Sequence, residues 1–178
     1  MNSNLAVSRT SRRYKHILTI LLYSVPVFYL SIWLFIDSLP SQLGYFNHSY
    51  EVVGGYTWLM RLLGFTASML KGAVVMYGLS ILIKLFKLYE DGTFFTSENV
   101  KSFKTFSNAL IWWVIAGIVA TPLISMILTM NNPPGQHVLE VTFQSTDLTA
   151  LIVGGILRVV AGVMENAQSL QEEAELTI

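Results

Sequence analysis

The sequence predicts an all-α, polytopic integral membrane protein, a bundle of four transmembrane helices with both termini cytoplasmic and a cytoplasmic extension of helix four. Three observations predict this fold. Of the 178 residues, 53% are apolar and only 12% are charged, whereas about a quarter of the residues in a soluble domain are charged. The apolar residues form four long runs. The basic residues gather in alternate connections between those runs.

Each run is long enough to cross a bilayer, which takes about 20 apolar residues at about 1.5 Å per residue. The predicted spans are 17–36, 62–83, 108–130 and 148–164, with a helical tail over 165–178. They form one domain, 1–178. The basic arm before the first run resembles a secretory signal, but that run is too long and no small-residue cleavage site follows it. The first span is therefore predicted to be an uncleaved anchor.

The orientation follows from the basic residues, because cytoplasmic loops are enriched in Lys and Arg. Four basic residues precede the first span, and four more lie between the second and third spans. The two other connections carry only Arg61. Both termini are therefore predicted to be cytoplasmic.

The sequence lacks the residues that several membrane activities need. It has no cysteine, which excludes disulfides, thiolate metal sites and thiol redox chemistry. No Asp, Glu or His lies inside the four predicted spans. This argues against a haem held by two histidines, an intramembrane protease and a proton-coupled exporter with a buried carboxylate. We expect no catalytic residues, no metal site and no cofactor, and we do not expect an enzyme.

Two basic residues interrupt the spans, Lys71 in the second and Arg158 in the fourth. Both spans run from outside to inside, so the two side chains should lie at similar depth. In the first interpretation, each side chain extends toward an interface or bonds backbone carbonyls. In the second, the two form a cationic pocket for an anion, a lipid headgroup or a carboxylate. Arg158 could alternatively reach Glu165, two turns further along the helix.

Small residues recur at four-residue spacing in the second and fourth spans, which lets helix backbones approach closely. They indicate either packing inside the bundle or a seam between copies in a homo-oligomer. Four tryptophans near span ends are expected at the membrane interfaces. The small-residue pairs are Ser68 with Gly72 and Ala150 with Gly154, and the tryptophans are Trp33, Trp58, Trp112 and Trp113.

The connection after the second span reads LYEDGTFFTSENVKSFK. Gly92 suits a turn with a left-handed backbone, and Thr96 suits the N-cap of the next helix. Phe95 and Val100 fit a hydrophobic staple around that cap. The connection is either a well-formed helix start or an elbow that docks a partner or senses lipid. Two phenylalanines of the new helix are expected toward lipid, Phe103 and Phe106.

The C-terminal run carries a narrow apolar stripe on an acidic helix. Its acids crowd the C-terminal end, where the helix dipole favours cations. A basic partner would relieve this mismatch, either another protein or the chain's own basic residues. The candidates within the chain are Arg12, Arg13, Lys101 and Lys104.

The outer side is predicted to be mildly acidic, with Glu140 and Asp147. Between them, residues 138–144 alternate apolar and polar side chains, which predicts a short strand.

The connection after the second span and the terminal LQEEAELTI resemble the bacterial membrane family called domain of unknown function 2975. Its name implies no activity, and the resemblance implies the bacterial inner membrane as the location. Members are often encoded beside a small Xre-type helix-turn-helix regulator, which the resemblance implies as a partner. The matching candidate partner-binding residues are Gly92, Phe95, Thr96, Asn99, Leu170, Glu173, Glu175, Leu176, Thr177 and Ile178.

These observations lead to one hypothesis and one alternative. The hypothesis is a non-enzymatic sensor or anchor that restrains a transcription regulator through the loop and the acidic tail, without itself touching nucleic acid. The alternative is a small transport, channel or lipid- or anion-binding bundle that uses Lys71 and Arg158. Membrane lipids are expected around the protein in both cases.

Overall fold

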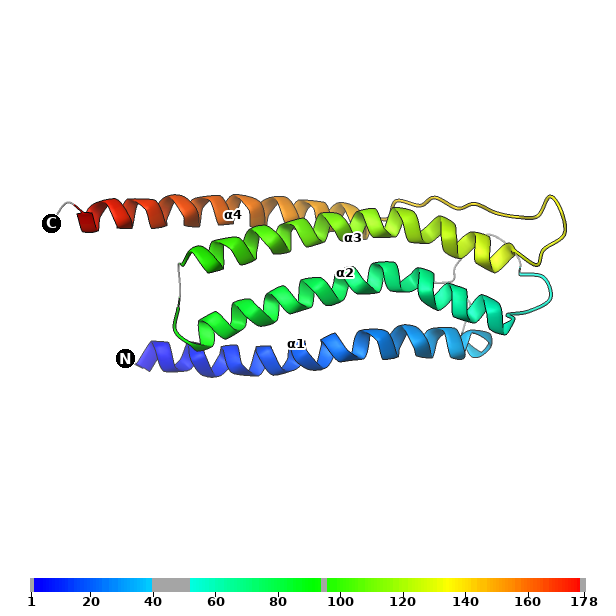
Figure 1. Cartoon of the computed structure of the whole chain (residues 1–178), viewed down its shortest axis with the longest axis horizontal. Helices are drawn as coiled ribbons and strands as arrows, with labels where there is room; N and C mark the ends of the chain where they lie inside the picture. The colour runs from blue at the N-terminus through cyan, green and yellow to red at the C-terminus, as the bar shows by residue number, and fades with distance from the viewer. Residues whose placement is uncertain (1, 40–51, 94–95, 177–178) are drawn as a thin grey trace.

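The computed structural model describes residues 2–39, 52–93 and 96–176. It consists of four long α-helices, α1 (Asn2–Leu34), α2 (Trp58–Glu90), α3 (Ser97–Thr129) and α4 (Ser145–Leu176), with a short 3-10 helix, η1 (Ile36–Ser38), after α1 (Figure 1). Every long helix contains a stretch that is long and apolar enough to cross a membrane. The prediction of an all-helical, multi-pass fold is therefore confirmed.

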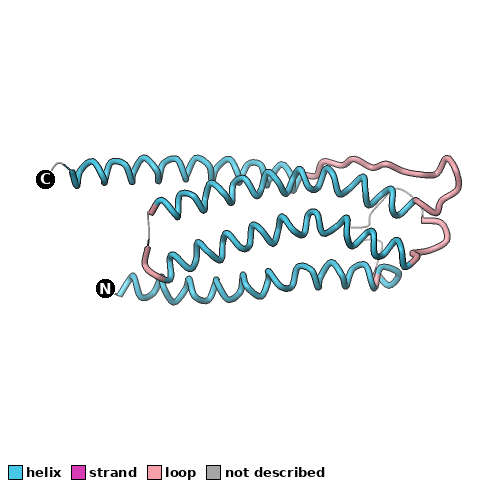
Figure 2. Tube along the Cα trace, in the orientation of Figure 1, coloured by secondary structure: helices cyan, strands magenta, loops and turns pink. Residues whose placement is uncertain are grey.

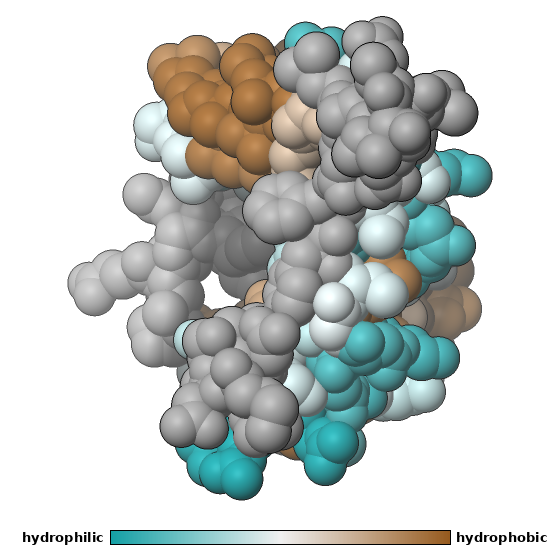
Figure 3. All heavy atoms as spheres, turned by 90° about the vertical axis from the view of Figure 1, so that its left-hand side faces the viewer, coloured by the Kyte–Doolittle hydropathy of each residue, from teal (hydrophilic) through white to brown (hydrophobic). Residues whose placement is uncertain are grey.

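Successive helices run in opposite directions, so both chain termini and the α2–α3 connection lie at one end, here called the termini end (Figure 1). A topology with both termini on the same side of the membrane requires this arrangement. That this side is the cytoplasm stays a prediction. Figure 3 looks onto the termini end, where hydrophilic residues gather on the lower and right sides and a hydrophobic group lies at the upper left.

The helices pack in chain order, α1 on α2, α2 on α3 and α3 on α4. At the end opposite the termini, Trp33 forms a buried core with Ile36 and Leu128. The indole N–H of Trp33 donates to Ser68 Oγ at 3.0 Å. Trp33 is only 2% exposed, because Gly64 leaves room for its ring between α1 and α2. Its predicted depth at the membrane interface stays a prediction.

The connection between α3 and α4 turns back and runs along α3 as an extended chain (Figure 2). Its backbone N–H groups bond hydroxyls of α3: Val138 donates to Thr129 Oγ1 at 3.1 Å, and Glu140 donates to Ser125 Oγ at 2.9 Å. The predicted strand over 138–144 is wrong, because this segment has no regular secondary structure. It lies beside a helix, and side-chain hydroxyls take the place of a neighbouring strand.

Helix α4 therefore begins beside the middle of α3. Its residue Asp147 lies close to Gly117, which is 12 residues, or about 18 Å, before the end of α3 at Thr129. At the termini end, α4 continues past the first turn of α3 (Figure 1). This offset determines which residues of α4 meet α2 and α3, and it leaves the last part of α4 projecting.

Candidate functional site

A lysine of α2 and an aspartate of α4 form an ion pair within the helical part of the protein. Lys71 Nζ lies 3.9 Å from Asp147 Oδ1. The same ammonium lies 3.9 Å from the ring centroid of Trp113 on α3, a favourable cation–π arrangement. The side chain of Asp147 is 5% exposed and that of Lys71 is 18% exposed. Helices α2, α3 and α4 thus meet around one ion pair, whose two charges sum to zero.

Glycine provides the space for this pair. A Cβ on Gly117 would lie 3.1 Å from Lys71 Nζ and 3.9 Å from Asp147 Oδ1. A larger residue at this position of α3 would push the lysine away from its partner.

Asp147 is held by the start of α4. Its Oδ2 accepts a bond from the backbone N–H of Gln144 at 2.9 Å, and its own N–H donates to Gln144 O at 2.9 Å. The bond to Oδ2 is the half of a capping box that the third helical residue supplies, while the backbone carbonyl of Gln144 accepts the other bond. The other oxygen, Oδ1, is buried and has no hydrogen-bond partner in the described part of the chain. The carboxylate therefore has one structural oxygen and one unused oxygen.

Sequence reasoning missed this residue. Asp147 was predicted to lie on the outer side, and the helices were predicted to contain no buried carboxylate, which the structure corrects. A signal was available, because Gln144 and Asp147 stand three residues apart just before an apolar run, the spacing of a capping box. Because Asp147 is buried, the lack of a buried carboxylate no longer speaks against a proton-coupled exporter.

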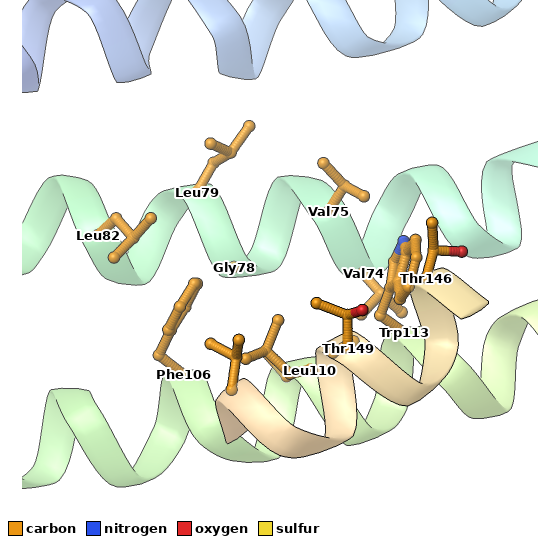
Figure 4. Close-up of a pocket in the computed structure, with 13 residues that line it drawn as sticks. Val74, Val75, Gly78, Leu79, Leu82, Phe106, Leu110, Trp113, Thr146 and Thr149 are labelled. Atoms are coloured by element: carbon orange, nitrogen blue, oxygen red, sulfur yellow. The ribbon is translucent and has the colours of Figure 1, made fainter. Parts of the chain in front are cut away.

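A cavity of about 450 Å³ lies between α2, α3 and α4. Figure 4 shows Trp113 and Thr146 together at one end of it, and Leu82 and Phe106 at the other. Phe106 was predicted to face lipid, but it lines this cavity because it packs toward Gly78 of α2. The lining residues are Val74, Val75, Gly78, Leu79, Leu82, Phe106, Ala109, Leu110, Trp113, Thr146, Thr149, Ala150 and Val153.

Arg158 lies apart from this site. Its guanidinium donates to Asn108 Oδ1 at 3.3 Å on an exposed face. Eleven residues, about 16 Å along α4, separate it from Asp147, the partner of Lys71. The expectation that the two cations lie at similar depth is wrong, because α4 starts beside the middle of α3. The structure does not bring Lys71 and Arg158 together.

Ion pairs at the termini end join neighbouring helices. Lys104 of α3 lies 2.7 Å from Glu165 of α4, which is an internal pairing of the kind predicted for the acidic tail. Glu165 therefore pairs with Lys104, and Arg158 makes its bond to Asn108 instead. Glu90 of α2 accepts from Arg12, at 2.7 Å, and from Lys15 of α1.

Hydrogen bonds hold the start of the α2–α3 connection, here called the elbow, in a defined conformation. Gly92 has a φ of 76°. Its N–H donates to Tyr89 O at 3.3 Å and that of Thr93 to Leu88 O at 3.0 Å, the two bonds of a Schellman motif. Asn99, which is 0% exposed, donates from Nδ2 to Thr93 O at 2.9 Å and so ties the elbow to α3.

The predicted partner-binding residues have different placements. Gly92 and Asn99 build the elbow, and the buried Asn99 offers no surface to a partner. Thr96 occupies the N-cap position as predicted, but its side chain makes no cap bond. Phe95, Thr177 and Ile178 lie outside the described residues, and so does the predicted staple of Phe95. Four others lie along the helical backbone of α4, namely Leu170, Glu173, Glu175 and Leu176.

The small-residue pairs serve packing between helices of one chain. A Cβ on Gly72 would lie 3.0 Å from the ring of Tyr29 on α1. Gly154 of α4 lies against α3, and its carbonyl accepts from Ser107 Oγ at 2.8 Å. These contacts support the prediction of packing inside the bundle, and a seam between copies stays a prediction.

Four apolar helices in antiparallel order, with a charge pair enclosed between three of them, define a small multi-pass helical membrane protein. The chain belongs to the family described as protein of unknown function (DUF2975), which matches residues 17–178. This confirms the resemblance seen in the loop and the tail. Neither the curated proteins nor the solved structures contain a match to the chain.

Proposed function

We propose that this chain is a non-enzymatic sensor or anchor in the bacterial inner membrane that binds a cytoplasmic helix-turn-helix transcription regulator and restrains it. The observation that supports the proposal most is the offset of α4, which carries its C-terminal turns beyond the start of α3 (Figure 1). Gln168 lines a groove with Ser97, the first residue of α3. The helix then continues to Leu176, eight residues or about 12 Å further.

The composition of this projecting arm, residues 169–176, suits a basic partner. It contains three glutamates and no basic residue. They lie at the C-terminal end of α4, whose dipole adds further negative potential. Proteins that bind DNA carry basic surfaces that neutralise phosphates. An acidic arm is complementary to such a surface, and binding it would compete with DNA.

The elbow supports the proposal in a different way. The Schellman motif and the Asn99 bond fix the α2–α3 connection beside Lys101 and Lys104. Lys104 holds Glu165, so α3 fixes α4 just before the arm begins. The elbow thus acts as a support for the arm, and the arm is the surface that we expect the regulator to contact.

The test is co-expression of the full chain with a small Xre-type helix-turn-helix regulator. We expect the regulator in the membrane fraction with the full chain and in the soluble fraction when residues 170–178 are deleted. Changing Glu172, Glu173 and Glu175 together to Gln keeps the helix and should release the regulator to a similar extent. Glu140→Gln, at the opposite end of the protein, is the matched control and should leave it bound.

A regulator that stays soluble with the full chain, or stays on the membrane with the deleted and neutralised arms, would rule out this role. Expression of each variant in the membrane has to equal that of the original chain for the comparison to count.

A further inference from the structure

The cavity and the Lys71–Asp147 pair meet at one tryptophan. The Trp113 ring lines the cavity and also lies 3.9 Å from Lys71 Nζ. On α2, Lys71 precedes the cavity residues Val74 and Val75 by three and four positions, so the three share one helix face. The cavity itself is apolar, and the charge pair lies next to its Trp113 end, outside its lining.

The Lys71–Asp147 pair has unused hydrogen-bonding capacity. Asp147 Oδ1 is buried and accepts no hydrogen bond within the described residues. Its distance of 3.9 Å from Lys71 Nζ is too long for a hydrogen bond. An ammonium has three donors and a carboxylate oxygen can accept, and buried polar groups normally have partners. The pair thus holds an unused donor and an unused acceptor beside the Trp113 end of the cavity.

The chemistry of the pair selects a head group. A hydroxyl can accept a bond from Lys71 and donate one to Asp147 at the same time. A carboxylate would be repelled by Asp147, and an ammonium would be repelled by Lys71. A purely apolar molecule would leave Lys71 Nζ and Asp147 Oδ1 without hydrogen bonds. The head group that fits both atoms is therefore neutral and hydroxylated.

The rest of the cavity selects the body of the ligand. Its volume of about 450 Å³ lies within the range of roughly 300–1,000 Å³ that is usual for small-molecule sites. Most of its wall is made of aliphatic and aromatic side chains of α2 and α3, such as Leu79, Leu82 and Phe106 (Figure 4). An alkyl chain matches such a wall.

We propose that this cavity binds a neutral, single-chain lipophile whose hydroxyl group bridges Lys71 and Asp147 and whose alkyl chain lies between α2, α3 and α4. The site lies in the helical part of the protein and does not depend on the cytoplasmic partner proposed above.

The test uses the purified full chain in detergent, with thermal unfolding followed in the presence of 1-dodecanol, dodecane, dodecanoate or dodecylamine at equal concentrations. We expect 1-dodecanol to raise Tm by about 3 °C at about ten times its Kd, and the other three probes to raise it less. The double variant Lys71→Met with Asp147→Asn, which leaves no lone buried charge, should respond equally to the alcohol and the alkane.

Two phenylalanine variants on α4 locate the site. Val153→Phe adds a ring to the cavity wall at a residue that is 41% exposed, and it should abolish the shift with 1-dodecanol. Val159→Phe, at a residue that is 67% exposed and outside the cavity lining, is the matched control and should keep it. Should Val153→Phe fail to fold, 11-bromo-1-undecanol offers a second measurement. It should quench tryptophan fluorescence in the original chain and much less in Trp113→Phe.

An equal response to dodecane and 1-dodecanol in the original chain would overturn the role of the charge pair. A larger response to dodecanoate or dodecylamine would overturn the assignment of a hydroxyl head group. An unchanged response in Val153→Phe, or no response to any probe, would overturn the site itself.

Discussion

The ammonium of Lys71 and the carboxylate of Asp147 face each other across 3.9 Å, on helices α2 and α4. They are 76 positions apart in the chain and are brought together by the extended segment that runs back along α3. Because each is the nearest opposite charge to the other, neither can be removed without leaving a poorly solvated charge behind.

This relationship predicts strong coupling between the two positions. Lys71→Met or Asp147→Asn alone should lower the free energy of unfolding by about 3 kcal/mol, because breaking a buried pair leaves one charge uncompensated. The double variant should lose much less than the sum of the two. A double-mutant cycle on thermal or denaturant unfolding in detergent measures the coupling, and additive losses would contradict the pairing.

A second prediction concerns the contact between α1 and α2. A Cβ on Gly64 would lie 2.1 Å from the Trp33 ring, and that ring is buried in the core. We expect Gly64→Ala to lower the free energy of unfolding by about 2 kcal/mol, as overpacking of a core does. Gly155→Ala on α4 is the matched control, since no atom lies within 4 Å of its Cβ. Equal unfolding midpoints for both variants would show that α1 does not pack on α2 in this way.

The spans were predictable because run length and the absence of charge are local properties of a sequence. The partner of Lys71 was not, because it depends on where α4 begins against α3. That position is set by backbone bonds from Val138 and Glu140 to hydroxyls of α3. Such bonds have no pattern that can be read from spacing alone.

The tryptophans show the same limit. Trp33 and Trp113 lie near predicted span ends, where the interface was the natural expectation. One is buried against Gly64 and the other lies under Lys71, contacts that a position near a span end does not predict. In both cases a neighbouring helix decides the environment, whereas the exposed Trp58 and Trp112 remain compatible with the interface.

The elbow provides a third prediction. Asn99→Ala removes the bond from Nδ2 to Thr93 O and leaves that carbonyl without its partner, which should cost about 1 to 2 kcal/mol. The loss should be local, so we expect faster proteolysis and faster amide exchange around residues 91–96. Asn166→Ala, at an exposed position of α4, should change neither rate. Unaltered proteolysis in Asn99→Ala would mean that the elbow does not depend on this bond.

The last prediction tests the offset of α4 directly. The chain has no cysteine, so introduced pairs report on distance without a background. Ser125 Oγ accepts from the N–H of Glu140 at 2.9 Å, and Ser125→Cys with Glu140→Cys should therefore cross-link readily under mild oxidation in membranes. Ser125→Cys with Thr149→Cys is the control. Thr149 lines the cavity with Trp113, which lies 12 residues, about 18 Å, from Ser125 along α3. If the connection looped away from α3 instead, the first pair would react no faster than the second, and the meeting of Asp147 with Lys71 would lose its structural basis.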